Sequence, residues 1–294
     1  RAPGLGDPPS MRHVYRIGDI EITRMTDTRQ RVLALLGEFP EQSFILKELA
    51  EAAEVTTSVV KGLVKLGAVA EHATPQDMPF PMLDPSLPSK ELSGDQEAAV
   101  EYLQRNGVGY STTLLKGVTG SGKTEVYLEA VSACLKQGRQ ALVLLPEIAL
   151  TSEFLTRVEA RFGARPAEWH SGVTMTERRR TWKMVGQGNA QMVVGARSAL
   201  FLPFQDLGLI VVDEEHDTSY KQEDGVLYNA RDMAVLRASL VGGQVVLASA
   251  TPSLESWENV ESGKYRKIDL KSRFGAAKMP EMRAIDMRKE TLPG

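Results

Sequence analysis

Residues Gly117 to Thr124 read GVTGSGKT, and this stretch decides the fold of the chain around it. It fits the pattern G-x-x-x-x-G-K-[ST] in the context that the pattern requires, because a strand-like run, TLLKGV, leads into it and a helical segment, TEVYLEAVSACLKQG, follows. The glycines allow the backbone to fold around a polyphosphate, so that N–H groups and the helix N-terminus point at the anion. The stretch therefore predicts a P-loop that binds ATP.

The P-loop pattern assigns a role to each residue type. Lys123 is expected on the β- and γ-phosphates, and the hydroxyl of Thr124 is expected to be a ligand of Mg²⁺. The rest of the loop is expected to surround the phosphates: Gly117, Val118, Thr119, Gly120, Ser121 and Gly122.

A second half of the site is predicted in the run LIVVDEEH, which ends at His216. Acidic residues at the carboxyl end of a buried strand lie beside the P-loop in a parallel sheet. Asp213 is expected to hold Mg²⁺, directly or through water. Glu214 is expected to polarise the attacking water, since hydrolysis at such sites depends mostly on positioning and charge stabilisation.

The fold class follows from the apolar runs around these motifs. ALVLLP, QMVVGA, LGLIVVD and QVVLASA are continuously apolar, and the segments between them are long enough for helices. Such strands are buried on both faces, which indicates a parallel sheet in an α/β fold. We therefore predict a P-loop NTPase (RecA-like) parallel sheet flanked by helices, preceded by a small winged-helix domain.

The region before the P-loop is divided by composition. Residues 1–28 have only a weak strand signal and are interpreted as the end of a preceding domain or a linker. Three segments with apolar residues at helical spacing and an extended GAVAEH suit a winged-helix domain over residues 29–74. Its third helix, Thr57 to Leu66, carries only Lys61 and Lys65 as basic residues, so both a DNA contact and a structural or protein-contacting role stay open.

A proline-rich stretch separates this domain from the P-loop. Five prolines lie between Thr74 and Pro88. Because proline fixes φ and lacks a backbone donor, residues 75–90 are predicted to be an extended linker at a domain boundary.

Composition excludes several classes of protein. The chain has 294 residues, a net charge of −3 and one cysteine, Cys134, which excludes an internal disulfide and a multi-cysteine zinc site within it. The charge gives no global attraction to nucleic acid, so such binding would need a local patch. No apolar run approaches a membrane span and the start shows no signal peptide, so a cytoplasmic protein without membrane contact is expected.

The P-loop and the acidic run together leave a small kinase, a transporter ATPase and a nucleic-acid motor open. Further runs occur in a fixed order: LSGDQEAAV, LLPEIALT, EWHSG, VVGARSALFLPF, DEEH and SATPS. In this order they resemble the first motor lobe of superfamily 2 DNA helicases. With DEEHDTSYKQEDG and the winged-helix pattern upstream, the chain is most similar to the primosomal protein N′ family of replication-restart helicases.

The resemblance implies a function and a division of the chain. It implies an ATP-dependent 3′-to-5′ DNA helicase that couples hydrolysis to unwinding in replication-fork restart and primosome assembly. Residues 91–272 would be the first, ATP-binding motor lobe, and residues 273–294 the start of the connection to a second lobe. The implied partners are forked and single-stranded DNA, single-stranded DNA-binding protein and other primosome proteins.

The resemblance also implies site residues. Gln96 stands where the family's Q motif reads adenine, although an exposed glutamine at a helix start is the alternative. His216 would couple the acidic box, residues 213–216, to the triplet Ser249, Ala250 and Thr251, unless it is a structural histidine. Glu147 is expected to cap the following helix rather than contact phosphate, because its charge repels the anion.

The expected DNA contacts lie at strand ends and in a loop. Pro146, Thr151, His170, Ser171, Arg197 and Ser198 follow strand candidates and would lie on one rim of the sheet. Tyr220, Lys221, Tyr228 and Arg231 resemble the family's aromatic-rich loop, in which bases stack on aromatic faces. The alternative is that the tyrosines hold the loop on the lobe.

The resemblance covers part of the family pattern. No second-lobe motif follows SATPSLESWENVESGKYRKIDL, and the zinc-binding cysteines of the family are missing, so zinc is expected only in a part outside this chain. We therefore expect a fragment that binds ATP and Mg²⁺ weakly and does not hydrolyse ATP at a useful rate by itself. A fork-reversal or restriction translocase, and a non-catalytic nucleotide-gated primosome binding module, remain alternatives.

Overall fold

The P-loop follows a strand of a seven-stranded sheet in which the order is β12-β4-β11-β8-β5-β7-β6. The computed structural model describes residues 11–20, 22, 25–39, 43–75, 78–105 and 109–271. Within these residues every pairing of the seven strands is parallel. The carboxyl ends of the strands therefore share one rim of the sheet. The strands are β4 (Ser111–Gly117), β5 (Gln140–Leu144), β6 (Ala167–Trp169), β7 (Met192–Gly195), β8 (Leu207–Asp213), β11 (Gln244–Ser249) and β12 (Arg266–Leu270).

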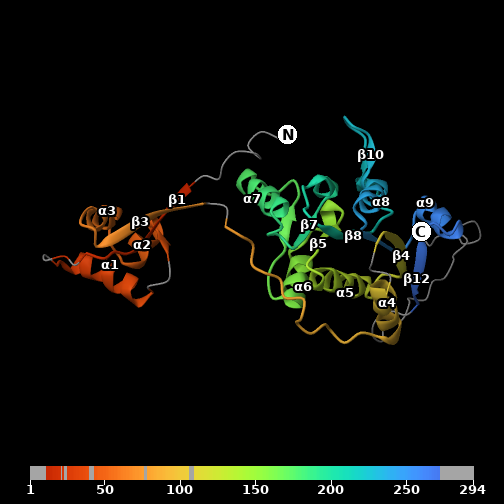
Figure 1. Ribbon diagram of the computed structural model, residues 1–294, viewed down its shortest axis with the longest axis horizontal. Helices are drawn as coiled ribbons and strands as arrows, with labels where there is room; N and C mark the ends of the chain where they lie inside the picture. Colours follow the sequence, from red (N-terminus) through yellow and green to blue (C-terminus); the bar gives the residue numbers. More distant parts are fainter. Residues whose placement is uncertain are drawn as a thin grey trace, which may run out of the picture. The chain divides into compact units, whose positions relative to one another are not determined.

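Helices cover both faces of this sheet (Figure 1). The helices α4 (Gly94–Arg105), α5 (Lys123–Lys136) and α6 (Ser152–Phe162) pack their apolar side chains on one face in a shared core. On the other face lies α8 (Ala230–Val241), which contacts β8 and β11. The predicted parallel α/β fold of the P-loop NTPase type is confirmed.

The remaining elements of this region lie between the seven strands along the chain. They are η1 (Glu147–Ala149), α7 (Met175–Gly186), η2 (Arg197–Phe201), η3 (Thr218–Tyr220), α9 (Leu254–Glu261) and a two-stranded hairpin of β9 (Lys221–Gln222) and β10 (Tyr228–Asn229). Among the helices of the described ranges, none combines the length and apolar character that a membrane crossing requires.

The described residues fall into two compact units. The N-terminal unit consists of residues 11–79 with 174–180, and the P-loop unit of residues 80–173 with 181–271. The predicted connection at residues 273–294 lies outside the described residues.

The N-terminal unit combines three helices with a three-stranded antiparallel sheet. Its elements are β1 (Met11–Ile17), α1 (Asp27–Glu38), β2 (Phe44–Ile45), α2 (Leu46–Ala52), α3 (Thr57–Lys65) and β3 (Val69–Pro75). The interpretation of residues 1–28 as part of another domain does not fit, because β1 pairs with β3 along its whole length, from Met11 with Pro75 to Ile17 with Val69. The first strand therefore belongs to this unit, whose identification as a winged helix stays a prediction.

The proline-rich segment differs from the predicted linker after Pro79. Residues 78–90 contain no helix or strand, as predicted, but residues 80–90 belong to the P-loop unit. Leu83 is buried in the core, and its backbone N–H donates to Gln191 Oε1 at 2.7 Å. Arg161 donates to the carbonyl oxygen of Leu87 at 2.8 Å. The segment is thus a strap fixed on the P-loop unit rather than a free linker.

Candidate nucleotide-binding site

A cavity of about 490 Å³ lies in front of the P-loop. Its volume is within the range of small-molecule sites, about 300 to 1,000 Å³. The predicted catalytic and ATP-binding residues contribute much of its lining, which consists of Lys90, Glu91, Gln96, Thr119, Gly120, Gly122, Lys123, Thr124, Glu125, Arg157, Asp213 and Glu214. The structure therefore brings the P-loop and the acidic run together, as the sequence predicts.

The P-loop backbone adopts a conformation that glycine permits. Gly120 and Gly122 have φ values of +81° and +80°, and a Cβ atom on Gly122 would lie 2.1 Å from Gln96 Nε2. Lys123, at the start of α5, is buried and donates from Nζ to the carbonyl oxygen of Gly117 at 2.9 Å. A tight backbone loop at a helix N-terminus, with a lysine beside it, fits a nucleotide polyphosphate.

Gln96 lies on α4 and ties this helix to the P-loop. Its side chain is 2 % exposed, which rules out the exposed helix-start glutamine. Nε2 donates to the carbonyl oxygen of Ser121 at 2.9 Å, and Oε1 accepts from the N–H of Ser93 at 2.9 Å. The amide thus lines the cavity in a fixed orientation, and its contact with adenine stays a prediction.

Asp213 ends β8 and also lines the cavity. Its Oδ2 accepts from the hydroxyl of Tyr127 at 2.9 Å, and its Oδ1 accepts from the N–H of Glu214 at 3.0 Å. Burial raises the pKa of the Asp213 carboxyl above its ordinary value. A divalent cation would favour the ionised carboxylate, so Asp213 fits a role as a Mg²⁺ ligand together with Thr124.

Tyr127 is a member of this site that the sequence interpretation missed. It lies one helical turn after Lys123 on α5 and is fully buried, and burial raises the pKa of its hydroxyl well above the ordinary value. The signal was the spacing, because residues four apart on a helix share a face. Its hydroxyl therefore remains a hydrogen-bond donor to Asp213.

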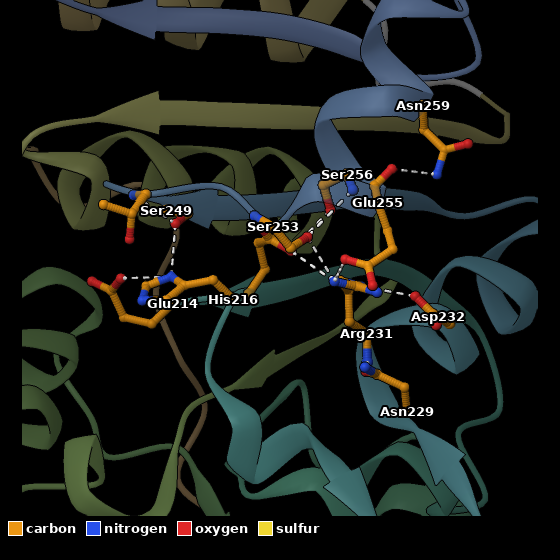
Figure 2. Close-up of polar contacts among 12 residues, drawn as sticks. Glu214, His216, Asn229, Arg231, Asp232, Ser249, Ser253, Glu255, Ser256 and Asn259 are labelled. Atoms are coloured by element: carbon orange, nitrogen blue, oxygen red, sulfur yellow. Dashed lines mark hydrogen bonds and ion pairs between the residues drawn. The ribbon is translucent and has the colours of Figure 1, made fainter.

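The backbone at Glu214 is in the left-handed region, with φ at +46°. This conformation is uncommon for a residue other than glycine and is typical of functional sites. His216 Nδ1 lies 2.8 Å from Ser249 Oγ and 3.7 Å from Glu214 Oε2 (Figure 2). Ser249 Oγ also accepts from the N–H of Thr251 at 3.0 Å. The structure therefore brings His216 together with the triplet 249–251, as expected.

Thr151 rather than Glu147 caps α6. Thr151 is the N-cap residue, and its Oγ1 accepts from the N–H of Phe154 at 3.3 Å. Glu147 instead begins η1, immediately after Pro146. The expectation that the Glu147 carboxylate caps the following helix is therefore wrong, because a nearer side chain supplies the acceptor.

Two predicted DNA contacts after β6 and β7 are engaged within the protein. His170 Nδ1 accepts from the N–H of Gly172 at 3.2 Å, and its Nε2 lies 3.2 Å from Glu168 Oε2. Ser198 Oγ accepts from Trp169 Nε1 at 3.1 Å. Ser171 is exposed beside His170. These residues lie at the carboxyl ends of parallel strands, so the structure places them on the rim that the sequence predicts.

Arg197 holds the loop that carries the predicted aromatic contacts. It donates to the carbonyl oxygens of Ser219 at 3.1 Å and Lys221 at 2.8 Å. Lys221 itself is exposed and pairs with Glu223 at 3.0 Å. Tyr228 is partly buried and packs edge-on against Phe201, with ring centroids 5.2 Å apart. Lys221 and part of Tyr228 therefore remain accessible.

Tyr220 and Arg231 differ from the predicted DNA contacts. Tyr220 is 1 % exposed, and its hydroxyl lies 2.6 Å from the carbonyl oxygen of Asp213 and 3.0 Å from that of Leu144. Arg231 is 6 % exposed and donates to Ser253 Oγ at 2.6 Å. Both side chains are too buried to contact a DNA strand directly. For Tyr220 the alternative, a tyrosine that holds the loop on the lobe, agrees with the structure.

Comparison with known proteins relates this site to a family. A family model described as DEAD/DEAH box helicase matches residues 93–260. The replication restart protein PriA of Rickettsia felis is 39 % identical over 300 residues, which cover 95 % of this chain and 46 % of the relative. PriA of Bacillus subtilis is 38 % identical over 282 residues, which cover 93 % of this chain and 34 % of the relative.

The chain thus spans between about a third and a half of the length of these curated relatives. The family match itself extends over more than half of the chain and contains Gln96, the P-loop, the acidic box and the triplet 249–251. The chain therefore belongs to the DEAD/DEAH box helicase family.

Proposed function

We propose that the protein is an ATP-dependent 3′-to-5′ DNA helicase of replication-fork restart and primosome assembly, and that this chain carries its ATP-binding motor lobe. The observation that carries the proposal is the single cavity lined by the P-loop, Asp213 and Glu214 in a chain of this family. The PriA relatives support the replication-restart role, and the family resemblance supports the direction of movement.

ATP hydrolysis in this proposal depends on how the chain holds the nucleotide. The P-loop amides and Lys123 bind the phosphates, and Gln96 reads the adenine edge. Thr124 and Asp213 would hold Mg²⁺, and the bound ion would supply positive charge to the phosphates. Glu214 orients the attacking water from its position beside Asp213.

The coupling of ATP hydrolysis to movement along DNA is assigned to His216 and the triplet 249–251. The short distance from His216 to Ser249 supports a link between the acidic box and the triplet 249–251. A change at the γ-phosphate that moves Glu214 would reach Ser249 through this imidazole. Because β11 carries the triplet at its carboxyl end, such a shift would alter the rim of the sheet.

DNA is proposed to bind along this rim. Thr151, Ser171 and Lys221 are exposed there, while the buried Pro146 does not fit the direct DNA contact predicted for it. His170, Arg197 and Ser198 shape the surface through the internal bonds described above. Tyr228 offers an aromatic face, and base stacking on such a face contributes about 1 to 3 kcal/mol per base. Tyr220 and Arg231 are assigned to holding the loop.

Partners are proposed from the family resemblance and the cellular compartment from composition. We place forked and single-stranded DNA, single-stranded DNA-binding protein and other primosome proteins as partners of the complete gene product, in the cytoplasm. Zinc is proposed only for regions of the relatives that have no counterpart in this chain.

The test measures DNA-stimulated ATP hydrolysis by the complete gene product. Lys221→Ala and Tyr228→Ala are expected to keep the basal rate and to lose most of the stimulation by single-stranded DNA. Binding of forked DNA and of single-stranded DNA-binding protein is measured in parallel. Binding of the protein partner without binding of any DNA would contradict the helicase and favour a primosome binding module.

A further inference from the structure

Glu215 is a buried carboxylate in the acidic box, and it has no role in the ATP binding or the DNA binding proposed above. It is 1 % exposed and lies between Glu214 and His216. Burial of a charged carboxylate costs several kcal/mol unless hydrogen bonds and a counter-ion compensate it. A buried acid next to two proposed catalytic residues therefore requires an explanation.

The carboxylate is compensated by one short segment and one arginine. Oε1 accepts from the N–H of Ser253 at 2.7 Å, and Oε2 accepts from the hydroxyls of Ser253 and Ser256, both at 2.8 Å. Arg231 Nη1 lies 3.4 Å from Oε2. Figure 2 shows Ser253 and Ser256, at the start of α9, close to Arg231 of α8. The carboxylate thus attaches the acidic box to the N-terminus of α9.

The hydroxyl of Ser253 can make all of its hydrogen bonds in this network at the same time. Ser253 Oγ donates to Glu215, accepts from Arg231 at 2.6 Å and accepts from the N–H of Ser256 at 3.3 Å. A fully satisfied buried polar network is rigid, because each lost bond would leave an unpaired group in a low dielectric. Glu215 is therefore held in one position.

The main chain of Glu215 is fixed as well. Its N–H donates to the carbonyl oxygen of Ala248 at 3.1 Å, one residue before the triplet 249–251. On its other side Asp213 is held by Tyr127 and by the strand β8. Glu214 lies between these two anchors with φ at +46°, a strained conformation for a residue with a Cβ. The anchors oppose relaxation of this backbone.

We propose that Glu215 is a positioning residue for ATP hydrolysis, whose buried carboxylate anchors the acidic box on Ser253 and Ser256 and holds Glu214 in its strained conformation. This inference rests on the proposed function. Glu215 does not line the cavity, so its effect reaches the reaction through the orientation of Glu214. The rate of hydrolysis should then depend on Glu215 while nucleotide affinity does not.

The test replaces the carboxylate by its isosteric amide in the complete gene product. In Glu215→Gln the amide nitrogen cannot accept a hydrogen bond, so donors from residues 253–256 or Arg231 lose their acceptor. We expect kcat for ATP hydrolysis to fall by about tenfold or more, with the dissociation constant of a non-hydrolysable ATP analogue within about threefold of the parent. Thermal unfolding is recorded to show that the variant is folded at the assay temperature.

A matched control is available on the same network. Glu255 also approaches Arg231, at 3.6 Å, but its side chain is 70 % exposed. Glu255→Gln makes the same chemical change and is expected to leave kcat within about twofold of the parent. Ser256→Ala, which removes one donor to Glu215 and no charge, serves if Glu215→Gln does not fold, and it is expected to lower kcat by about threefold or more at unchanged analogue affinity.

Three results would overturn the inference. One is a kcat within about twofold of the parent in folded Glu215→Gln, or in Ser256→Ala where Glu215→Gln does not fold. Another is a parallel loss of kcat and analogue affinity, which would indicate a general structural role. The third is absence of ATP hydrolysis by the parent, or an undiminished rate in Lys123→Ala. That third result identifies failure of the proposed function itself, whereas a normal Lys123 dependence with a parent-like Glu215→Gln identifies failure of this inference alone.

Discussion

At the scale of the residue, Gly122 shows how closely the P-loop backbone is fitted. Its φ is +80°, and a Cβ atom at this position would lie 2.1 Å from Gln96 Nε2, so the Gln96 amide would have to move to make room for a side chain. Gly122→Ala is therefore expected to displace Gln96 and to weaken ATP binding by about tenfold or more, measured by titration with a fluorescent ATP analogue.

The matched control for this change is Gly138→Ala. Gly138 has a similar φ of +75° just after the end of α5, but no atom lies within 4 Å of a Cβ placed there. The Gly138→Ala variant should therefore have a free energy of unfolding lower by about 1 kcal/mol, from the same backbone strain, and should keep its ATP affinity. Equal affinities of the two variants would contradict the role given to Gly122.

Cys134 offers a residue-scale test of burial and pH. Burial raises the pKa of its thiol to about 12, so the reactive thiolate is scarce at neutral and mildly alkaline pH. Alkylation by iodoacetamide at about pH 8 should be at least about 100-fold slower in the native protein than in urea, where the pKa returns to about 8.5. Rapid labelling of the folded protein at that pH would show that the thiol is accessible.

The residue roles differ in how far the sequence could predict them. Lys123, Asp213 and Glu214 belong to motifs whose spacing already implies proximity. The burial of Tyr220 and Arg231 could not be predicted in this way, because aromatic and basic residues in a polar segment suit an exposed DNA contact equally well. Their partners, Leu144 and Ser253, are distant in sequence, so only the folded chain shows them.

At the scale of the element, the segment from Asp213 to Arg231 is a loop held at both ends. Tyr220 fixes its start through the carbonyl oxygens of Asp213 and Leu144. Tyr220→Phe should therefore lower the free energy of unfolding by about 1 to 3 kcal/mol, because the carbonyl groups that share the single proton of this hydroxyl lose their donor. Chemical denaturation measures this change.

Tyr228→Phe is the control for the same loop. Tyr228 is partly buried and contacts Phe201 through its ring, which the substitution retains. Its effect on stability should stay within about 0.5 kcal/mol. A loss in Tyr228→Phe as large as in Tyr220→Phe would mean that the Tyr220 hydroxyl is not the specific anchor.

The strands were predictable where they are buried on both faces. The five runs predicted from apolar continuity correspond to β4, β5, β7, β8 and β11, which form the centre of the sheet. β6 and β12 are not among these apolar runs, because β6 has three residues and β12 reads RKIDL, with mostly exposed side chains. Both lie at the edges of the sheet, where solvent replaces one neighbour and the apolar signal weakens.

At the scale of the whole molecule, the boundary between the two units was the least predictable feature. The prolines predict extended backbone, but composition does not show whether extended backbone is free or docked. The side chain of Gln191, which binds Leu83 N–H at 2.7 Å, is 108 positions away in the chain and gives no local signal.

The docked strap gives a prediction for the stability of the P-loop unit. Leu83→Ala removes a side chain that is 5 % exposed and should lower the free energy of unfolding by about 2 to 4 kcal/mol. Met82→Ala, at a neighbouring side chain that is 72 % exposed, should change it by less than about 0.5 kcal/mol. Urea unfolding of both variants measures the difference, and equal values would indicate a free linker.

ATP held by the P-loop is proposed to drive DNA unwinding. ATP hydrolysis and unwinding of a forked DNA are measured in the same reaction, with the complete gene product and its Lys123→Ala variant. Lys123→Ala is expected to lose both activities by about 100-fold or more, while Lys136→Ala, an exposed lysine at the end of the same helix, retains both. Unwinding by Lys123→Ala at the rate of the parent would show that the P-loop does not drive unwinding.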